Sequence, residues 1–209
     1  MLSFPNWKPP ITTILFYISY SESRWNMSII NPKHLVTTDD MLYYLHEYHP
    51  YYSDSFTKER NPNYDKASKM IFKLKCGDQD ALDHFIQKLD KLIPHEVCLS
   101  YVPSSDSTKT NSGISRVAQA LSKLHNRIDA TSCLKRVVSI PKAAYGGPRS
   151  IEVHLSSIRL QNANLINGKD VVLLDDITTS GSSFEACKII LQRAQPKSIT
   201  CFALGKTTR

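Results

Sequence analysis

The sequence lacks any cysteine arrangement that would indicate a disulfide framework or a zinc ribbon. Its five cysteines are odd in number and scattered through 209 residues, and no CxxC pair occurs among them. Cys98, Cys187 and Cys201 lie in apolar segments and are typical of core residues. The chain is long enough to bury a sizeable core in one domain with a modest appendage.

A hydrophobic run long enough to cross a membrane is also missing. The only candidate targeting segment, Ile11 to Tyr20, is interrupted by Thr12, Thr13 and Ser19. A membrane span needs ~20 apolar residues, and the run lacks the small-residue end of a cleaved signal. We interpret it as a buried strand and expect no membrane contact and a cytoplasmic location.

Positive charge is concentrated in the second part of the chain. Residues 1–60 hold five Lys/Arg against six Asp/Glu, whereas residues 61–209 hold 21 against 13, a surplus of eight. A site for a highly anionic substrate needs such charge, and so does a nucleic-acid surface. The charge alone does not separate these two interpretations.

The first 63 residues are expected to form an irregular appendage or hood. Thr37 to Asp40 indicates a helix start ahead of Met41, Leu42 and Leu45. The many aromatic residues of this part favour core or interface packing, with base stacking as the alternative. They are Trp7, Tyr17, Tyr20, Trp25, Tyr43, Tyr44, Tyr48, Tyr51 and Tyr52.

Residues 64–209 show strands alternating with helices, which predicts an α/β fold with a parallel sheet. The stretch Lys142 to Gln161 is poorly periodic and is interpreted as a long mobile loop. Strands are expected at Glu96–Val102, Arg136–Ile140, Asp170–Leu174 and Ser198–Leu204. Helical faces are expected within 67–74, 80–91, 113–125 and 184–194.

One segment, Val171 to Ser183, carries the strongest functional signal. Four apolar residues run into the adjacent carboxylates Asp175 and Asp176, and a loop of hydroxyls around Gly181 precedes a helix. Ligands of open α/β sheets bind at the carboxyl ends of strands, and a helix N-terminus favours phosphate. Hydroxyl groups donate to phosphate oxygens, and carboxylates bind sugar hydroxyls or a hydrated divalent cation. We expect both carboxylates at the strand end, near solvent and unpaired.

This segment resembles the phosphoribosyl-pyrophosphate (PRPP) motif of type I phosphoribosyltransferases, with Thr178 where an aliphatic residue is more usual. Residues 64–206 further resemble the ComF-type branch, through "YDKASKMIFKLKCGD" (64–78), "YVPSSDSTKTNSGISRVAQALSK" (101–123) and "LKRVV" (134–138). Two features depart from that branch. The cysteine zinc ribbon is missing, and the loop after Val102 carries serines and Lys109 instead of several arginines.

The resemblance implies a twisted parallel sheet flanked by helices and a transfer from PRPP with loss of pyrophosphate. Asp175 and Asp176 would bind the ribose hydroxyls and Mg²⁺. The 5′-phosphate would be held by Thr178, Thr179, Ser180, Gly181, Ser182 and Ser183. Ser104, Ser105 and Lys109 match the position of the pyrophosphate loop.

The loop 142–161 occupies the place of the family's flexible catalytic loop. Its cations Lys142, Arg149 and Arg159 are candidates to reach the pyrophosphate, with Arg136 and Arg116 as weaker ones. His154 titrates near neutral pH and suits acid–base chemistry, although a surface histidine is the simpler interpretation.

The sequence does not identify the acceptor of the transferred group, and three functions are compatible with the same pocket. The chain transfers a phosphoribosyl group to a base or amine from PRPP or a related ribose phosphate. Alternatively, it is a regulator that senses PRPP or binds nucleic acid without turnover. The third possible function is that of an effector in a defence or toxin module, such as a retron-type system, with a nucleic-acid or protein partner. A homo-oligomer is compatible with all three.

Overall fold

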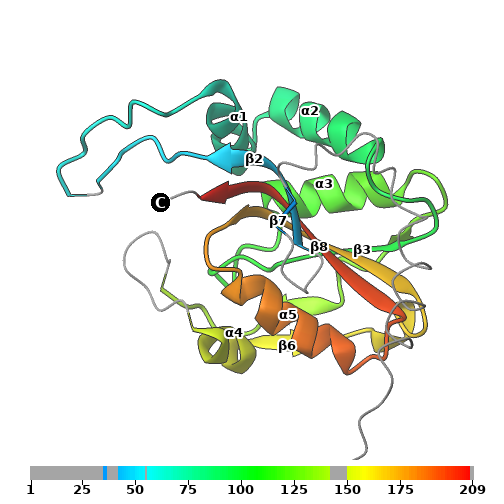
Figure 1. Cartoon of the computed structure of the whole chain (residues 1–209). Coiled ribbons are helices and arrows are strands. Elements are labelled where there is room, and N and C mark those ends of the chain that lie inside the picture. The colour runs from blue at the N-terminus through cyan, green and yellow to red at the C-terminus, as the bar shows by residue number, and fades with distance from the viewer. Residues whose placement is uncertain (1–34, 37–41, 55, 142–149, 208–209) are drawn as a thin grey trace, which may run out of the picture.

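A six-stranded, mostly parallel sheet forms the centre of the computed structural model, which describes residues 35–36, 42–54, 56–141 and 150–207 (Figure 1). The five strands β2, β8, β7, β3 and β4 lie side by side in this order, and each neighbouring pair is parallel. Strand β1 is antiparallel to β2. The strand order is β1 (Leu35–Val36), β2 (Leu42–Tyr48), β8 (Ser198–Thr207), β7 (Asp170–Thr178), β3 (Cys98–Tyr101), β4 (Ile128–Asp129). The predicted α/β class with a parallel sheet flanked by helices is confirmed.

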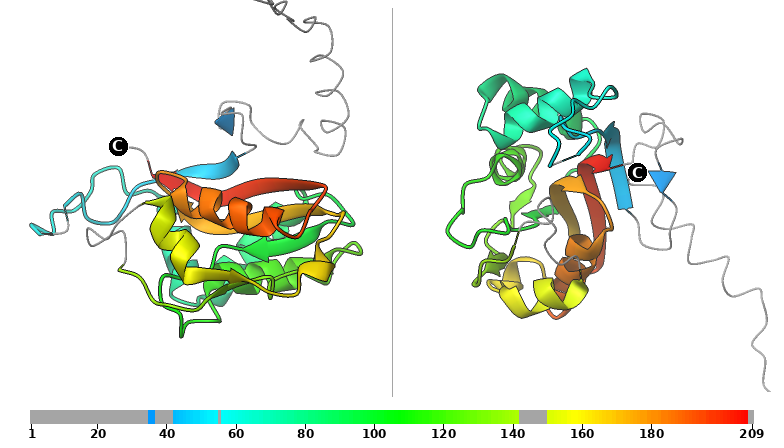
Figure 2. Two further views of the ribbon diagram at one scale, coloured as in Figure 1. Left: turned by 90° about the horizontal axis from the view of Figure 1, so that it is seen from below. Right: turned by 90° about the vertical axis from the view of Figure 1, so that its left-hand side faces the viewer.

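Helices cover both faces of this sheet (Figures 1 and 2). Val172 and Leu174 of β7 pack in the cluster formed with the first three helices, and Val171 and Leu173 pack in the cluster formed with α5. A parallel strand buried on both faces has a continuous apolar sequence, as β7 does. The first face carries α1 (Lys66–Lys75), α2 (Gln79–Asp90) and α3 (Gly113–Ser122), and the second carries α4 (Ile151–Ser157) and α5 (Ser182–Gln192). A small antiparallel pair, β5 (Leu134–Arg136) and β6 (Ile158–Leu160), and a short 3₁₀ turn, Ala163–Leu165, complete the described part.

The sheet changes winding direction between β3 and β7. The chain leaves β3 through α3 to reach β4 on one side, and it leaves β7 through α5 to reach β8 on the other. Because α3 and α5 lie on opposite faces, the connections after β3 and β7 diverge. Such a switch point opens a crevice at the carboxyl ends of the strands, where ligands of α/β sheets bind.

Three predictions about secondary structure were wrong. The strand expected at Arg136–Ile140 is β5, which covers Leu134–Arg136 and pairs with β6 outside the main sheet. The helix expected from Met41 onward is strand β2, which pairs with β8. The loop expected over 142–161 contains helix α4 and strand β6. Residues 142–149, like the segment Ile11 to Tyr20, lie outside the described residues. The role of residues 1–63 as a hood stays a prediction.

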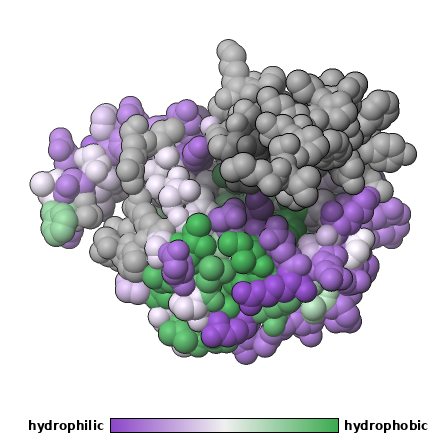
Figure 3. Space-filling view, turned by 60° about the horizontal axis from the view of Figure 1, so that its bottom comes forward, coloured by the Kyte–Doolittle hydropathy of each residue, from purple (hydrophilic) through white to green (hydrophobic). Residues whose placement is uncertain are grey.

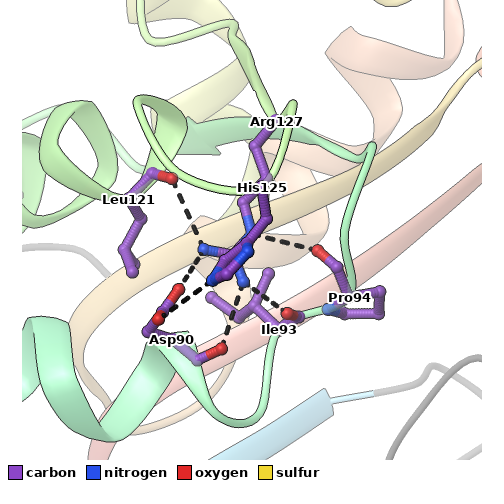
Figure 4. Close-up of polar contacts among 6 residues, drawn as sticks. All are labelled: Asp90, Ile93, Pro94, Leu121, His125 and Arg127. Atoms are coloured by element: carbon purple, nitrogen blue, oxygen red, sulfur yellow. Dashed lines mark hydrogen bonds and ion pairs between the residues drawn. The ribbon is translucent and has the colours of Figure 1, made fainter.

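The buried side chain of Arg127 links the C-terminal ends of α2 and α3, at the edge of the sheet away from the switch point (Figure 4). The Arg127 side chain is fully buried and binds the Asp90 carboxylate at 2.6 Å. It also donates to the carbonyls of Ile93 at 2.6 Å and Pro94 at 3.0 Å. His125 Nε2 lies 3.2 Å from the other Asp90 oxygen. A buried guanidinium is stable here because its donors have acceptors.

The face on the side of α4 and α5 carries a patch of hydrophobic surface bordered by hydrophilic residues (Figure 3). Exposed apolar side chains outside the aromatic ones include Val137 at 44% and Val138 at 58% exposure, and both directly follow β5. None of the described helices has the length and apolar character that a membrane crossing requires.

Candidate functional site

The two adjacent carboxylates lie near the carboxyl end of β7, one on each side of the sheet. Asp175 is only 8% exposed, and its carboxylate accepts from the Asp176 backbone N–H at 2.8 Å and from Ser183 Oγ at 3.5 Å. The second bond comes from the first turn of α5. Asp175 therefore connects the strand to the helix that begins after the hydroxyl loop.

Burial raises the pKa of Asp175 well above its ordinary value, and the nearby Asp176 carboxylate acts in the same direction. Lys75 and the two hydrogen bonds to Asp175 oppose this shift without outweighing it. Two close carboxylates do not ionise independently. In the ligand-free protein, the acid pair holds a proton on Asp175 more readily than an exposed aspartate would.

Asp176 forms an ion pair with Lys75, whose Nζ lies 3.2 Å from Asp176 Oδ1. Burial acts to lower the pKa of Lys75, but the carboxylates of Asp176 and Asp175 outweigh it and the pKa is raised. The expected position near solvent is wrong for Asp175, which is buried, whereas Asp176 is partly exposed and its pair with Lys75 lies outside the core. Lys75, at the end of α1, is the site residue that sequence reasoning missed.

The hydroxyl loop and the start of α5 form the part of the candidate site that is predicted to bind phosphate. Gly181 is the N-cap of α5 with φ +81°, and α5 has no side-chain cap at its N-terminus. The first N–H groups of a helix without such a cap are available to an anion. A methyl group on Gly181 would meet no atom within 4 Å, so space for an anion lies beside the loop.

The hydroxyls around Gly181 are partly engaged with each other. Ser180 Oγ and Ser182 Oγ lie 2.9 Å apart, and Thr179 donates to Thr207 Oγ1 of β8 at 3.2 Å. Among described residues, two buried side-chain hydroxyls lack any hydrogen-bond partner, Ser100 on β3 and Thr178 on β7. Both belong to the strands that flank the switch point. Unsatisfied buried polar groups are costly and are expected at functional sites.

The second loop of the site follows β3, directly beside β7. Val102 N–H donates to the Leu174 carbonyl at 2.9 Å, so the two loops start from neighbouring positions. Ser104 and Ser105 are partly exposed and Lys109 is exposed. The Ser104 hydroxyl accepts from the Asp106 N–H at 3.2 Å. The loop after β3 therefore lies beside the loop after β7, and its role in binding pyrophosphate stays a prediction.

The buried side chain of Arg136 binds the backbone of this second loop. Its buried guanidinium donates to the carbonyls of Ser104 and Pro103, to Ser157 Oγ, and to His154 Nδ1 at 3.4 Å. Burial and the neighbouring guanidinium lower the pKa of His154. Arg136 is therefore a link between the loop after β3 and α4, and half-buried His154 serves as its acceptor.

Of the three predicted lid cations, the described residues include only Arg159. Arg159, on β6, donates to the carbonyls of Ser156 at 2.9 Å and Ile158 at 3.0 Å, where α4 ends. Arg116 binds the Gly77 carbonyl and Gln79 Oε1 at the turn between α1 and α2. Lys142 and Arg149 lie outside the described residues.

Asp175 and Asp176 could bind Mg²⁺ only together with a ligand that supplies further oxygen atoms. In the described ranges, no group of three or more His, Cys, Asp or Glu side chains is arranged to hold a metal ion. Carboxylate oxygens are the correct donor type, but Lys75 already neutralises one of the two charges. Mg²⁺ would therefore enter with a pyrophosphate-bearing ligand, and Asp175 and Asp176 would supply part of its surroundings.

Comparison with known proteins gives similarity at the level of structure only. No protein-family model matches the chain, and no curated protein sequence is similar to it. A hypoxanthine-guanine phosphoribosyltransferase from Bacillus anthracis is similar at 17% identity and a TM-score of 0.33, covering 68% of each chain. A hypoxanthine phosphoribosyltransferase from Trypanosoma cruzi has 15% identity and the same TM-score, covering 70% of this chain and 72% of its own. With TM-scores this low, these similarities carry no weight for the activity of the chain.

Proposed function

We propose that this protein is a phosphoribosyltransferase that binds PRPP with Mg²⁺ at the carboxyl ends of β3 and β7. The observation that carries the proposal is the assembly at the switch point. The acid pair Asp175 and Asp176, the uncapped N-terminus of α5 behind Gly181, and the Ser104–Lys109 loop all lie at that edge. A donor with a 5′-phosphate, a ribose and a pyrophosphate needs these three kinds of group side by side.

In the proposed reaction, the bond between ribose C1 and pyrophosphate breaks while a nucleophilic acceptor forms a new bond to C1. The ribose becomes cationic in the transition state, and positioning with electrostatic stabilisation provides most of the catalysis. The carboxylate of Asp176 holds the ribose hydroxyls and stabilises this positive charge. Mg²⁺, when bound with the donor, neutralises the leaving pyrophosphate.

A regulator that binds the same ligand without turnover is the second candidate. Arg136, a buried cation next to the loop after β3, is occupied by the carbonyls of Pro103 and Ser104 and by Ser157. The loop itself offers Lys109 but also exposed Asp106, whose carboxylate accepts from Thr108. This arrangement gives the loop little positive charge to stabilise a departing pyrophosphate.

Pyrophosphate release separates the two candidates. The full chain is incubated with PRPP, Mg²⁺ and a panel of nucleobases and amines, with Asp176→Asn as the inactive control. An enzyme releases pyrophosphate with at least one acceptor, and the control does not. Ligand binding without release under any acceptor assigns the chain to the regulator.

A further inference from the structure

The exposed aromatic side chains of the described chain are gathered in one region. Of seven large hydrophobic side chains that are exposed, four are aromatic, and all four lie between Tyr51 and the end of α1. They are Tyr51 and Tyr52 at 44% exposure each, Phe56 at 93% and Phe72 at 50%. Aromatic groups this exposed and this concentrated indicate a contact surface.

Three of these aromatics stand on a projecting arm, defined as residues 49–64. The arm extends from the carboxyl edge of the sheet beside α1 (Figure 1). Its two halves pair through an isolated antiparallel bridge between Tyr52 and Arg60. Its base is fixed to α1, since the His49 N–H donates to Ser68 Oγ at 3.0 Å. The described residues of the arm, 49–54 and 56–64, are therefore joined to each other and to α1 by hydrogen bonds of the backbone.

The rings at the base of the arm also pack against one another. Tyr51 contacts Tyr52 edge-on at 4.8 Å and Tyr64 at 5.1 Å between ring centroids, and the Arg60 guanidinium lies 6.0 Å from the Tyr51 ring centre. Tyr52 nevertheless stays 44% exposed, and Phe56 is 93% exposed. These two side chains are the natural candidates for contacts with a ligand.

Positive charge accompanies the aromatic groups. Residues 49–72 contain four Lys/Arg and three Asp/Glu, and one of the acids, Asp65, is used as the N-cap of α1. Lys66, Lys69 and Phe72 follow each other at three-residue spacing, which places them along one exposed stripe of the helix. Cations and flat rings thus alternate from the arm onto α1.

We propose that the arm and this stripe of α1 bind single-stranded nucleic acid. Bases stack on aromatic side chains while lysine and arginine follow the phosphates, without a requirement for sequence. A protein partner fits less well, because lysine is depleted in protein–protein interfaces. The surface lies outside the phosphate pocket, so the test of this inference does not depend on the proposed transferase activity.

Fluorescence anisotropy of a labelled single-stranded 20-mer, titrated with the full chain across a salt series, tests the inference. Tyr52→Ala with Phe56→Ala is expected to weaken binding about tenfold or more at low salt. Lys66→Gln with Lys69→Gln should reduce the slope of log affinity against log salt by about 1.4, because each lost phosphate contact removes about 0.7. PRPP at saturating concentration should not displace the strand.

Matched controls use exposed residues elsewhere in the molecule. Leu124→Ala with Val138→Ala removes exposed apolar groups, and Lys91→Gln with Lys123→Gln removes two exposed cations at the opposite edge of the sheet. Equal effects of arm and control variants would overturn the inference, as would the absence of any binding at low salt. If the arm variants change only the sedimentation of the protein itself, the aromatics form a protein contact and the inference is wrong.

Discussion

Lys75 Nζ lies 3.2 Å from Asp176 Oδ1 and joins the end of α1 to the candidate ribose site on β7. Both side chains are partly exposed, so the pair adds about 1 kcal/mol or less to stability. Its larger effect is electrostatic, because Lys75 reduces the negative charge that an anionic ligand must approach.

Lys75→Met should therefore weaken PRPP binding about tenfold, roughly 1.4 kcal/mol, with little change in melting temperature. Lys75→Arg should keep most of the affinity. Lys73→Met is the matched control, because Lys73 stands on the same helix at the same 40% exposure and pairs with Asp78 instead. Calorimetric titration measures all three variants, and equal losses in Lys73→Met and Lys75→Met would show that site proximity is irrelevant.

Asp175→Asn should stabilise the ligand-free protein at pH 7 while abolishing ligand binding. Burial, aided by the Asp176 charge, raises the pKa of Asp175. The folded chain thus holds this proton more tightly than the unfolded chain, and stability falls as pH rises from about 4 through the raised pKa. The variant lacks this loss and can still accept from the Asp176 N–H.

Thermal unfolding of wild type and Asp175→Asn from pH 4 to pH 8 provides the measurement. The advantage of the variant should grow as pH rises and should be smallest at pH 4, close to the ordinary aspartate pKa of about 3.9 that applies in the unfolded chain. A variant less stable than wild type at pH 7 would mean that the ionised carboxylate supports the fold.

Gly181→Ala should reduce both stability and ligand affinity. The residue has φ +81°, a conformation that costs an alanine about 1 kcal/mol. The added methyl group would occupy the open space beside the loop, where the phosphate is expected. Affinity for PRPP or ribose 5-phosphate should fall about tenfold or more.

Gly168→Ala controls for the backbone strain alone. Gly168 has φ +67°, and a methyl group there also meets no atom within 4 Å. It lies before β7, at the end of the strand away from the loop. Similar destabilisation of both variants with unchanged affinity in Gly168→Ala is expected, whereas unchanged affinity in Gly181→Ala would move the phosphate site elsewhere.

Arg127→Met should destabilise the fold by about 3 kcal/mol or more, because it removes the donor to Asp90 Oδ1 and to the carbonyls of Ile93 and Pro94. Arg116→Met, which removes a partly exposed arginine bonded to Gly77 and Gln79, should cost about 1 kcal/mol or less. Urea unfolding gives both values. A small effect of Arg127→Met would show that α2 and α3 are held by apolar packing alone.

The segment around β7 could be predicted from sequence because its signals are local. Four apolar residues, two carboxylates, a glycine and a helical pattern follow one another within thirteen positions, and the structure has the strand, the turn and the helix there. The boundaries moved, since β7 extends through Asp175 and Asp176 to Thr178 and α5 begins at Ser182.

The other features of the fold and of the candidate site could not be predicted, because they depend on contacts between residues that are distant in sequence. Leu42 and Leu45 have helical spacing, but this segment forms strand β2 by pairing with β8, which lies more than 150 residues away in sequence. Helix α4 has one short apolar face with too few turns for a periodic signal. Lys75 could not be assigned to Asp176, because only the packing of α1 against the sheet brings the two together.

Calorimetric titration of the purified chain with PRPP and Mg²⁺ tests the central claim most directly, with Asp176→Asn as the control. The account predicts binding with a dissociation constant in the low millimolar range or tighter, about −4 kcal/mol or better, and no binding to the control. A wild-type protein that shows no response to PRPP, ribose 5-phosphate or any nucleotide would contradict it.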